Sequence, residues 1–229
     1  MSSQAWQNKK VLVTGGTSGL GRALAEQLVQ SGAQVAVVGR HANRHRPYPG
    51  ITFIRGDVGA KNEVHRIHAE ALSVLGGIDV LIHNASSLGH VPLRILLDTE
   101  CETFEEVLQT NLIGPFRLSK LVVPEMILNH AGIVVAISSD AAVNAYPKWG
   151  AYSVSKAALD HLTRIFQAEL SDTGVHFLAL DPGDMDTPLH AAAVPDAERS
   201  SLHSPASSAR LLLEQIATET FQPVRRSLR

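Results

Sequence analysis

The sequence predicts a single α/β domain over residues 1–229, in which a doubly wound parallel β-sheet forms the middle of three layers (α/β/α). Two observations predict this class. Short apolar runs alternate along the chain with longer segments whose apolar residues recur at helical spacing, as in successive βαβ units. In addition, 45% of the residues are hydrophobic, so a chain of this length can bury a sizeable core.

The first strand, turn and helix are expected within residues 11–28. Three apolar residues at 11–13 predict a short buried strand, and Leu20, Leu24 and Leu28 recur at helical spacing. The turn between them contains four glycines: Gly15, Gly16, Gly19 and Gly21. Such a turn leaves the N–H groups of the helix N-terminus free for an anion such as a pyrophosphate. The last glycine is followed by Arg-Ala rather than by Lys and then Ser or Thr, which excludes a nucleoside triphosphatase loop.

The remaining elements follow the same alternation. Further strands are expected at residues 34–38, 51–54, 78–82, 133–137 and 175–180, and helices at 61–75, 102–129, 151–170 and 211–216. Pro115 and Pro124 are expected to interrupt or kink the helix at 102–129. Residues 41–50 are polar and contain two prolines, so they cannot hold a full helix. Ligands bind at the carboxyl ends of such strands, where Asn84, Ser139 and Asp181 are expected to lie.

Composition excludes several classes of partner. The formal net charge of −2 gives no reason to expect binding to nucleic acid or to an anionic membrane surface. The apolar runs are too short to span a bilayer, and the first ten residues lack the apolar core of a signal peptide, so a cytoplasmic protein is expected. The one cysteine, Cys101, is interpreted as a structural residue, and no metal site is predicted.

Tyr152 and Lys156 lie four residues apart in a predicted helix, so their side chains share one face. A free tyrosine has a pKa of about 10, too high for acid–base work near neutrality. A nearby lysine cation is expected to lower the pKa of Tyr152. Ser139, at the end of the preceding strand, is placed to hold a carbonyl oxygen beside the phenol by donating a hydrogen bond. Taken alone, a Tyr and a Lys one helical turn apart are more often a surface pair. Together with the serine and the glycine turn they predict a catalytic group.

The order of these motifs resembles that of the short-chain dehydrogenase/reductase family, over about residues 9 to 190. The matching segments are Thr14-Gly15-x-x-x-Gly19-x-Gly21, Asp57-Val58, Asn84-Ala85, Asn111, Ser138-Ser139, Tyr152-x-x-x-Lys156, Asp181-Pro182-Gly183 and Thr187. The resemblance implies a Rossmann-like fold and an oxidoreductase that interconverts a carbonyl and an alcohol of a small molecule by hydride transfer.

The resemblance also implies a role for each matching residue. The pyrophosphate turn would comprise Gly15, Thr17, Ser18, Gly19, Leu20 and Gly21. Asp57 and Val58 would contact the adenine, while Asn84 and Ala85 would lie near the ribose and the nicotinamide. The nicotinamide end would be enclosed by Pro182, Gly183 and Thr187. Ser139, Tyr152 and Lys156 would be the catalytic residues, with Lys156 also binding the cofactor. Asn111 would hold a water that relays protons to Lys156. Tyr146 has no lysine four residues on, so it is interpreted as a pocket or core residue.

Cofactor choice can be predicted from the end of the second strand. NAD binders place an acid there for the ribose 2′-hydroxyl, whereas an arginine accommodates the 2′-phosphate of NADP. Arg40 occupies this position, and no acid lies between Arg40 and Asp57. A permanently charged, planar guanidinium suits a phosphate. NADP(H) is therefore the preferred cofactor, with NAD(H) possible.

The sequence departs from the family pattern at three places. Ser86 stands where a third glycine usually follows Asn84-Ala85, and the short segment at 41–50 is expected to lose the helix normally found there. After the helix at 211–216 no glycine-rich seventh strand is visible, so the sheet is expected to lack it. Residues 217–229 are interpreted as a tail whose arginines, Arg225, Arg226 and Arg229, are solvated.

The sequence also suggests a substrate loop and a subunit contact, and it leaves the substrate and one alternative function open. Residues 185–205 are expected to form a mobile substrate loop. The helices at 102–129 and 151–170 are candidates for pairing two subunits in a homodimer. Trp149 and Tyr146 suggest an apolar substrate, although core packing explains them equally well. The alternative to an enzyme is a non-catalytic NADP(H)-binding regulator of the same fold. A nucleotide-sugar epimerase would need a different glycine spacing and a longer C-terminal region.

Overall fold

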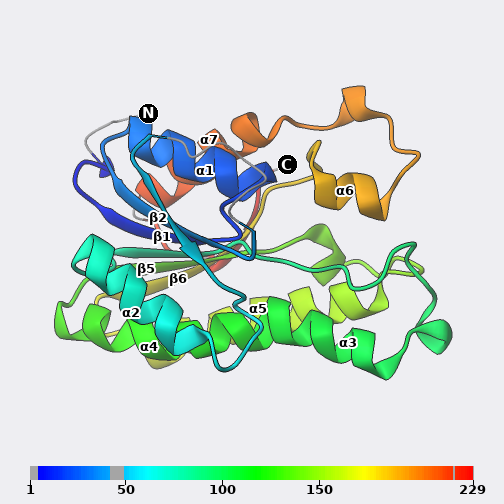
Figure 1. Ribbon diagram of the computed structural model, residues 1–229, viewed down its shortest axis with the longest axis horizontal. Helices are drawn as coiled ribbons and strands as arrows, with labels where there is room; N and C mark the ends of the chain where they lie inside the picture. Colours follow the sequence, from blue (N-terminus) through cyan, green and yellow to red (C-terminus); the bar gives the residue numbers. More distant parts are fainter. Residues whose placement is uncertain (1–4, 42–48, 219, 229) are drawn as a thin grey trace.

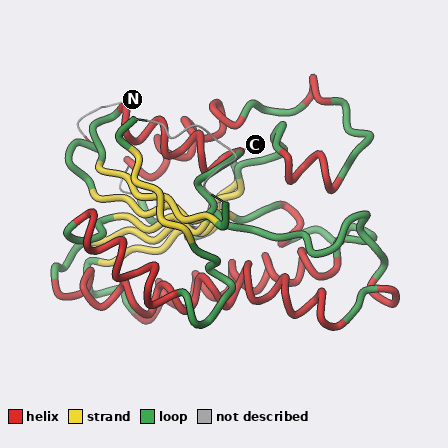
Figure 2. Tube along the Cα trace, viewed as in Figure 1, coloured by secondary structure: helices red, strands yellow, loops and turns green. Residues whose placement is uncertain are grey.

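The computed structural model describes residues 5–41, 49–218 and 220–228. It contains a seven-stranded sheet in the order β3-β2-β1-β4-β5-β6-β7, in which every neighbouring pair is parallel. The strands are β1 (Lys10–Thr14), β2 (Gln34–Gly39), β3 (Ile51–Arg55), β4 (Val80–His83), β5 (Gly132–Ile137), β6 (Val175–Asp181) and β7 (Arg225–Ser227). Figure 2 shows the strands as a central layer between two layers of helix. The expected doubly wound, Rossmann-like sheet is confirmed.

Helices cover both faces of the sheet (Figure 1). One face carries α1 (Gly19–Gln30) and α7 (Pro205–Ala217), and the opposite face carries α2 (Val64–Leu75), α4 (Gly114–Leu128) and α5 (Gly150–Glu169). Alternation along β1 explains why both faces are apolar: Val11 and Val13 pack on the side of α1 and α7, whereas Leu12 packs on the side of α2 and α4. The strand order reverses between β1 and β4, which makes their carboxyl ends a topological switch point.

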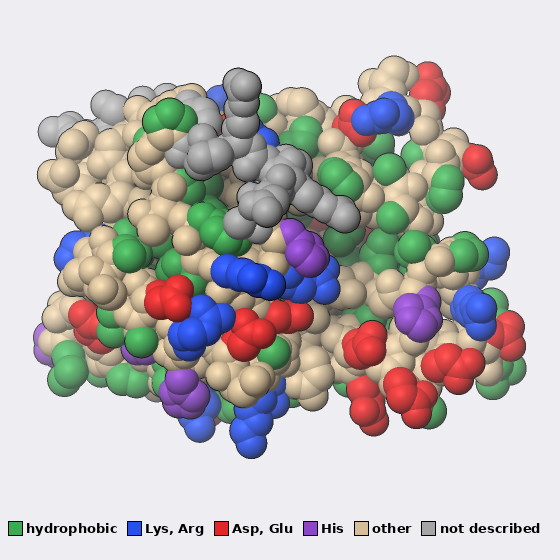
Figure 3. Space-filling model, viewed as in Figure 1, with side chains coloured by type: hydrophobic (Ala, Val, Ile, Leu, Met, Phe, Trp, Pro, Cys, Tyr) green, Lys and Arg blue, Asp and Glu red, His purple; other side chains and the backbone are tan. Residues whose placement is uncertain are grey.

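The expected long helix at 102–129 consists of three segments. They are α3 (Cys101–Leu108), a π-helical turn η3 (Gln109–Ile113) and α4. The interruption therefore lies at η3, just before Pro115, which occupies the first turn of α4, where a missing N–H costs little. Acidic side chains gather over α3 on the face shown in Figure 3. Cys101 is an exposed free cysteine at the start of α3.

The sheet has the seventh strand that the sequence did not reveal, so that expectation was wrong. β7 pairs with β6 through Ala179↔Arg225, Leu180↔Arg226 and Asp181↔Ser227. Backbone hydrogen bonds extend the pairing at both ends, from Ala179 N to Val224 O (2.9 Å) and from Leu228 N to Asp181 O (3.0 Å). The three residues of β7, two arginines and a serine, have no apolar pattern from which a strand could be predicted. It forms because β6 offers an edge with unpaired backbone groups.

The arginines of this segment are not simply solvated, which corrects a second expectation. The Arg225 side chain is only 16% exposed and pairs with Asp160. Arg226 donates to the side chain of Gln215 and to the backbone oxygen of Pro223. Arg229 lies outside the described residues.

The expected substrate loop contains local structure. It includes the short helix α6 (Pro188–Ala193), the 3₁₀ turn η5 (Arg199–Ser201) and a bridge between Met185 and His203. Arg199 also forms a bidentate ion pair with Asp186. Two further 3₁₀ turns, η2 (Leu96–Asp98) and η4 (Asp140–Ala142), flank the same end of the sheet. Of the segment at 41–50, residues 42–48 lie outside the described part of the chain, so the loss of a helix there stays a prediction. Among the described helices, none is long and apolar enough to cross a membrane.

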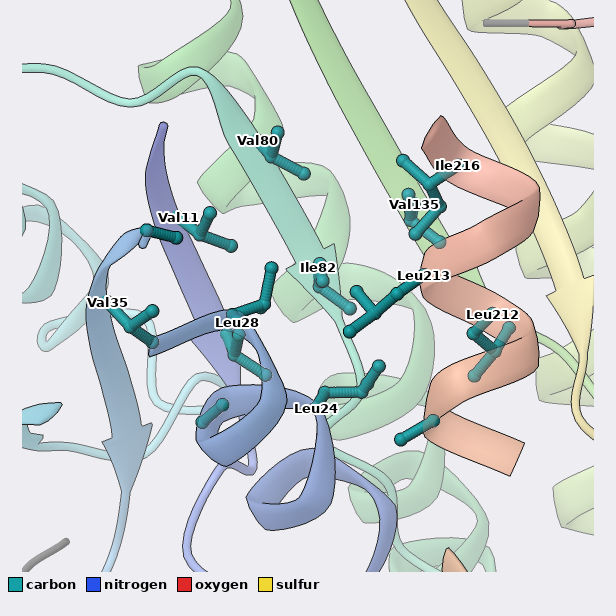
Figure 4. Close-up of a cluster of buried hydrophobic side chains, with 14 of the residues drawn as sticks. Val11, Leu24, Leu28, Val35, Val80, Ile82, Val135, Leu212, Leu213 and Ile216 are labelled. Atoms are coloured by element: carbon teal, nitrogen blue, oxygen red, sulfur yellow. The ribbon is translucent and has the colours of Figure 1, made fainter. Parts of the chain in front are cut away.

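The core between α1, α7 and the sheet is drawn in Figure 4. Leu213 is fully buried there, near Leu24 and Ile82 (Figure 4). Replacing Leu213 with alanine is expected to lower the free energy of unfolding by about 3 kcal/mol, because lost burial and a residual cavity both contribute. Urea unfolding measures it. Leu128→Ala, at a site 81% exposed, is the matched control and should change stability by less than about 0.5 kcal/mol. An equal loss in both variants would contradict the assignment of this core.

Candidate active site

A cavity of about 1020 Å³ lies at the carboxyl ends of the strands, across the switch point. Its walls come from the segments that follow β1, β2, β3, β4, β5 and β6 and from the α6 region. Most of the predicted site residues line it: Gly15, Thr17, Ser18, Gly19, Leu20, Arg40, Asp57, Val58, Asn84, Ala85, Ser139, Tyr152, Lys156, Pro182, Gly183 and Thr187. Two predicted residues, Gly21 and Asn111, are not among the lining residues. One cavity therefore brings together side chains from nearly the whole chain.

The glycine turn is tightly built against β4. Gly15 has φ +66°, and a Cβ there would lie 2.8 Å from Ala85 Cα. A Cβ on Gly21 would lie 2.3 Å from Asn84 Nδ2 and 2.4 Å from Gly15 O. Real Cβ atoms do not approach so closely, so glycine is required at both positions. Gly21 is therefore not part of the cavity wall. Its missing side chain lets α1 pack closely against Gly15 and Asn84.

Asn84 and Thr14 hold this turn in place. The Asn84 side-chain amide donates to the backbone oxygens of Thr14 and Gly15, both at 3.0 Å. In return, Thr14 Oγ1 accepts hydrogen bonds from the backbone N–H groups of Asn84 and Ala85, both at 3.1 Å. The side chain of Asn84 therefore shapes the turn from the β4 side.

The N-terminus of α1 faces the cavity through Ser18, Gly19 and Leu20. The N-cap residue Ser18 makes no side-chain cap hydrogen bond, and the first turn of α1 contains no acidic residue. Helix N-termini carry a partial positive charge and N–H groups without intrahelical partners. This end of the cavity is therefore suited to an anion.

At the end of β2, Arg40 and His41 line the same part of the cavity. Asp57, which follows β3, accepts a hydrogen bond from the backbone N–H of Gly59 at 2.8 Å. Its own backbone N–H donates to Glu63 at 3.2 Å. The Asp57 carboxylate is thus held in its own turn, beside the buried Val58.

The predicted catalytic residues meet at the inner end of the cavity. Tyr152 and Lys156 project from the first two turns of α5 and are 7% and 2% exposed. Lys156 Nζ lies 5.6 Å from the centre of the Tyr152 ring and donates to the backbone oxygen of Ile137 at 2.7 Å. Trp149 packs edge-on against the Tyr152 ring, with 5.6 Å between the ring centres. Packing therefore fixes both the phenol and the ammonium.

Burial controls the acidity of this pair. It raises the pKa of Tyr152 to about 12, and hydrogen bonds with Ser139 and Ser86 only partly oppose it. Burial also lowers the pKa of Lys156 to about 8, while the charge of Asp160 raises it. The sequence led us to expect that Lys156 would lower the pKa of Tyr152. In this structure desolvation of the phenol is the largest cause of the shift and Lys156 is not among the causes, so the pKa is raised and Tyr152 is a neutral phenol at pH 7.

Ser139 begins the turn after β5. Its Oγ accepts from Ala141 N at 3.2 Å and donates to Asp140 Oδ1 at 3.2 Å. Tyr146 donates from its hydroxyl to the other oxygen of Asp140 at 2.7 Å. Tyr146 lines the cavity and is 43% exposed, so of its two interpretations the pocket residue is correct.

Asn111 lies in the π-helical turn η3 and is fully buried. Its Nδ2 donates to Ser87 O and to Ser155 Oγ, both at 2.9 Å, and its Oδ1 accepts from Ser87 N at 2.7 Å. The side chain therefore joins the loop after β4 to α5. The water that Asn111 was expected to hold stays a prediction.

The site prediction from the sequence gave no role to two charged residues that lie close to the cavity, Asp160 and Arg225, and it named Asp181 only by its place at the end of a strand, where Asp181 lines the cavity. Asp160 follows Lys156 by one turn of α5, a spacing that the sequence does contain. Asp181 ends β6, where the fold places ligand-binding side chains. Arg225 lies far from both in sequence, so no local pattern connects it to the site.

Comparison with known proteins decides the family. The family model described as short chain dehydrogenase matches residues 9–198. The chain belongs to this family. Short-chain dehydrogenases are NAD(P)-dependent oxidoreductases that act on CH–OH groups, and this chain is one of them. It is 31% identical over 191 residues to the 2-(R)-hydroxypropyl-CoM dehydrogenase of Xanthobacter autotrophicus, covering 80% of this chain and 76% of that protein.

Solved structures of other proteins have the same fold. The 3-ketoacyl-(acyl-carrier-protein) reductase of Brucella melitensis, complexed with NADH, has a TM-score of 0.86 at 23% identity and covers 97% of each chain. A short chain dehydrogenase of Shigella flexneri, complexed with NADP, has a TM-score of 0.79 at 23% identity and covers 89% of each chain. Both nicotinamide cofactors thus occur in solved proteins of this fold.

Proposed function

We propose that this short-chain dehydrogenase uses NADP(H) to interconvert a carbonyl and an alcohol, with Tyr152 as the acid–base residue and with Ser139 and Lys156 as its partners. The observation that carries the proposal is the geometry of one cavity. The neutral phenol of Tyr152, the hydroxyl of Ser139 and the ammonium of Lys156 lie at its inner end. The glycine turn and the α1 N-terminus lie along the same cavity.

The residues present fit a dinucleotide. A cavity of about 1020 Å³ lies at the upper end of the usual size of a small-molecule pocket, and it is lined by the glycine turn and the α1 N-terminus, which suit an anion. The α1 N-terminus would hold the pyrophosphate, and Asp57 and Val58 the adenine. Asn84 and Ala85 would hold the ribose, while Pro182, Gly183 and Thr187 would enclose the nicotinamide. When bound, NADP(H) supplies or accepts the hydride.

The side chains of the inner end supply the proton. With a pKa of about 12, Tyr152 carries its proton at pH 7 and can donate it to a carbonyl oxygen. Ser139 orients that oxygen by donating a hydrogen bond. Lys156, whose pKa is about 8, is mostly an ammonium at pH 7 and stabilises the phenolate that forms. In the oxidative direction the same groups take the proton back.

The substrate end of the cavity is mostly apolar. Trp149, Leu189, Val194 and Leu202 line it, together with Tyr146. An aldehyde or ketone with an apolar substituent fits such walls, because desolvating an apolar group there is favourable.

The choice of NADP(H) rests on Arg40 at the end of β2. Replacing Arg40 with aspartate is expected to weaken NADPH binding by about 10- to 100-fold, because a charge-assisted hydrogen bond is lost and a repulsion is introduced. NADH binding should improve or stay unchanged. Fluorescence titration with both cofactors measures the two dissociation constants. Arg210→Asp, on the exposed side of α7, is the control. Equal effects on NADPH and NADH would contradict the role of Arg40.

Turnover tests the function itself. NADPH and NADH oxidation is followed over a panel of aldehydes, ketones and quinones. Turnover that prefers NADPH supports the proposal. Tight NADPH binding without turnover of any substrate would favour the alternative, a non-catalytic regulator, and absence of binding of either cofactor would refute both.

We also propose a homodimer formed through α4 and α5. These helices expose Phe116, Val154 and Ile165 at 38%, 46% and 41%. Light scattering at working concentration tests this proposal, and a monomer mass would refute it.

A further inference from the structure

The guanidinium of Arg225, in β7, lies behind the inner end of the cavity and contacts three other elements. Its Nε donates to Asp160 Oδ2 on α5 at 2.7 Å. Its Nη2 donates to the backbone oxygen of Ser139 at 3.1 Å and lies 3.6 Å from Asp181 Oδ2 at the end of β6. One side chain therefore joins β7 to α5, β6 and the turn after β5.

Each of these partners belongs to a segment that carries a proposed site residue. Asp160 lies one helical turn beyond Lys156. Asp181 accepts a hydrogen bond from Gly183 N at 3.0 Å, which shapes the Pro182-Gly183 turn. The Ser139 oxygen also accepts from Ala142 N at 3.1 Å, so it anchors the turn that presents the Ser139 hydroxyl.

The contacts are buried. Asp160 and Asp181 are 3% and 2% exposed, and the Arg225 side chain is 16% exposed. Two carboxylates out of water are costly unless a cation balances them. A planar guanidinium presents its donors in a fixed fork, so Arg225 hydrogen-bonds Asp160 and the Ser139 carbonyl at once while its charge lies close to Asp181.

We propose that Arg225 is a positioning residue, which sets the place of Ser139 and of the Pro182-Gly183 turn by fixing their backbone against α5. This inference rests on the proposed function, because it treats Ser139 as a residue of the reaction. Arg225 is not among the residues that line the cavity. Its effect reaches the reaction through the Ser139 carbonyl and the two carboxylates.

The neighbouring Arg226 provides a matched control within the same strand. Arg226 donates to Gln215 on α7 and to the backbone oxygens of Pro223 and Gln222. These partners lie on the other side of β7 from α5 and the Ser139 turn. Loss of Arg226 removes an arginine and several hydrogen bonds from β7 without removing a contact to the Ser139 turn.

The test compares Arg225→Gln with Arg226→Gln by two independent measurements. Amide hydrogen exchange of residues 138–142 is expected to accelerate at least about tenfold in Arg225→Gln and to stay within about twofold of wild type in Arg226→Gln. In turnover assays, kcat of Arg225→Gln should fall by about 10- to 100-fold, because small misplacements of reacting groups are that costly. The dissociation constant for NADPH should change by less than about threefold, because the Pro182-Gly183 turn supplies only one part of the proposed cofactor site, whereas the glycine turn and Arg40 are untouched.

Two further variants test the proposal if Arg225→Gln does not fold. Arg225→Lys keeps the positive charge but loses the planar, forked guanidinium. The double variant Arg225→Gln with Asp160→Asn removes both charges of the 2.7 Å ion pair, so that no Asp160 carboxylate is left buried without its cation. Arg225→Lys should recover part of kcat, whereas the double variant should fold and still exchange rapidly at residues 138–142.

The outcomes separate the two proposals. If wild type turns over no substrate, the proposed function fails, and exchange at residues 138–142 alone decides whether Arg225 positions this turn. Unchanged exchange in the Arg225 variants, or equal acceleration in Arg226→Gln, overturns the inference. Faster exchange with unchanged kcat also overturns it, because the turn would then not matter to the reaction.

Discussion

Replacing Tyr152 with phenylalanine is expected to lower kcat for carbonyl reduction by about 10³-fold, while the dissociation constant for NADPH stays within about twofold. The phenol of Tyr152 combines a transferable proton at pH 7 with burial at the inner end of the cavity, close to Ser139 and Lys156. Phenylalanine keeps the ring and its packing against Trp149, so the fold and the cofactor site should persist. Steady-state turnover and fluorescence titration measure the two quantities.

Tyr146→Phe is the appropriate comparison, because it removes a phenol from the same cavity. The Tyr146 hydroxyl donates to Asp140 and lies on an exposed wall, so its loss should reduce kcat far less than the loss of the Tyr152 hydroxyl. Similar losses in both variants would mean that the Tyr152 hydroxyl has no special part in proton transfer. Full turnover by Tyr152→Phe would refute the proposed chemistry while leaving cofactor binding intact.

The sequence predicts most of this fold because most of its strands are buried on both faces. Such strands read as continuous apolar runs, as at residues 11–13 and 133–137, and each run lies within an observed strand. β7 escaped prediction because Arg225-Arg226-Ser227 has no apolar pattern. What stabilises it is an edge of β6 and ion pairs to residues far away in sequence, which local periodicity cannot report.

The candidate site was predictable for a topological reason. In a parallel sheet the carboxyl ends of successive strands meet at one edge, so polar residues that end several apolar runs must converge. Arg40, Asn84 and Ser139 each follow a strand, and all three line the same cavity. Arg225 could not be predicted, because it lies 65 residues from Asp160 and 86 residues from Ser139. Nor could the raised pKa of Tyr152, since desolvation depends on how deeply the phenol is packed.

Lys156 illustrates a conflict between stability and function. We expect Lys156→Met to abolish most activity and yet to raise the free energy of unfolding at pH 7. In the folded protein burial holds the pKa of Lys156 near 8, whereas an unfolded lysine titrates near 10.5. The fully buried ammonium is therefore disfavoured by two to three pKa units, on the order of 3 kcal/mol. Loss of the hydrogen bond to the Ile137 oxygen offsets part of the gain.

The stability difference between Lys156→Met and wild type should depend on pH, in a direction that follows from the pKa of Lys156. Below about pH 8 the lysine is charged in both states, so the full cost of burying the ammonium is present in the wild type. Between about pH 8 and pH 10.5 the unfolded chain binds the extra proton, so wild-type stability rises with pH. The advantage of Lys156→Met should therefore be greatest below pH 8 and should shrink as the pH approaches 10.5.

Urea unfolding of both proteins at pH 7 and at pH 10 measures this difference. Lys61→Met is the control, because Lys61 is exposed just before α2 and its loss should alter stability little at either pH. A stability difference between Lys156→Met and wild type that stays constant from pH 7 to pH 10 would show that the ammonium is not held against a desolvation cost. A difference that narrows would show that this protein gives up stability in order to keep a cation beside Tyr152.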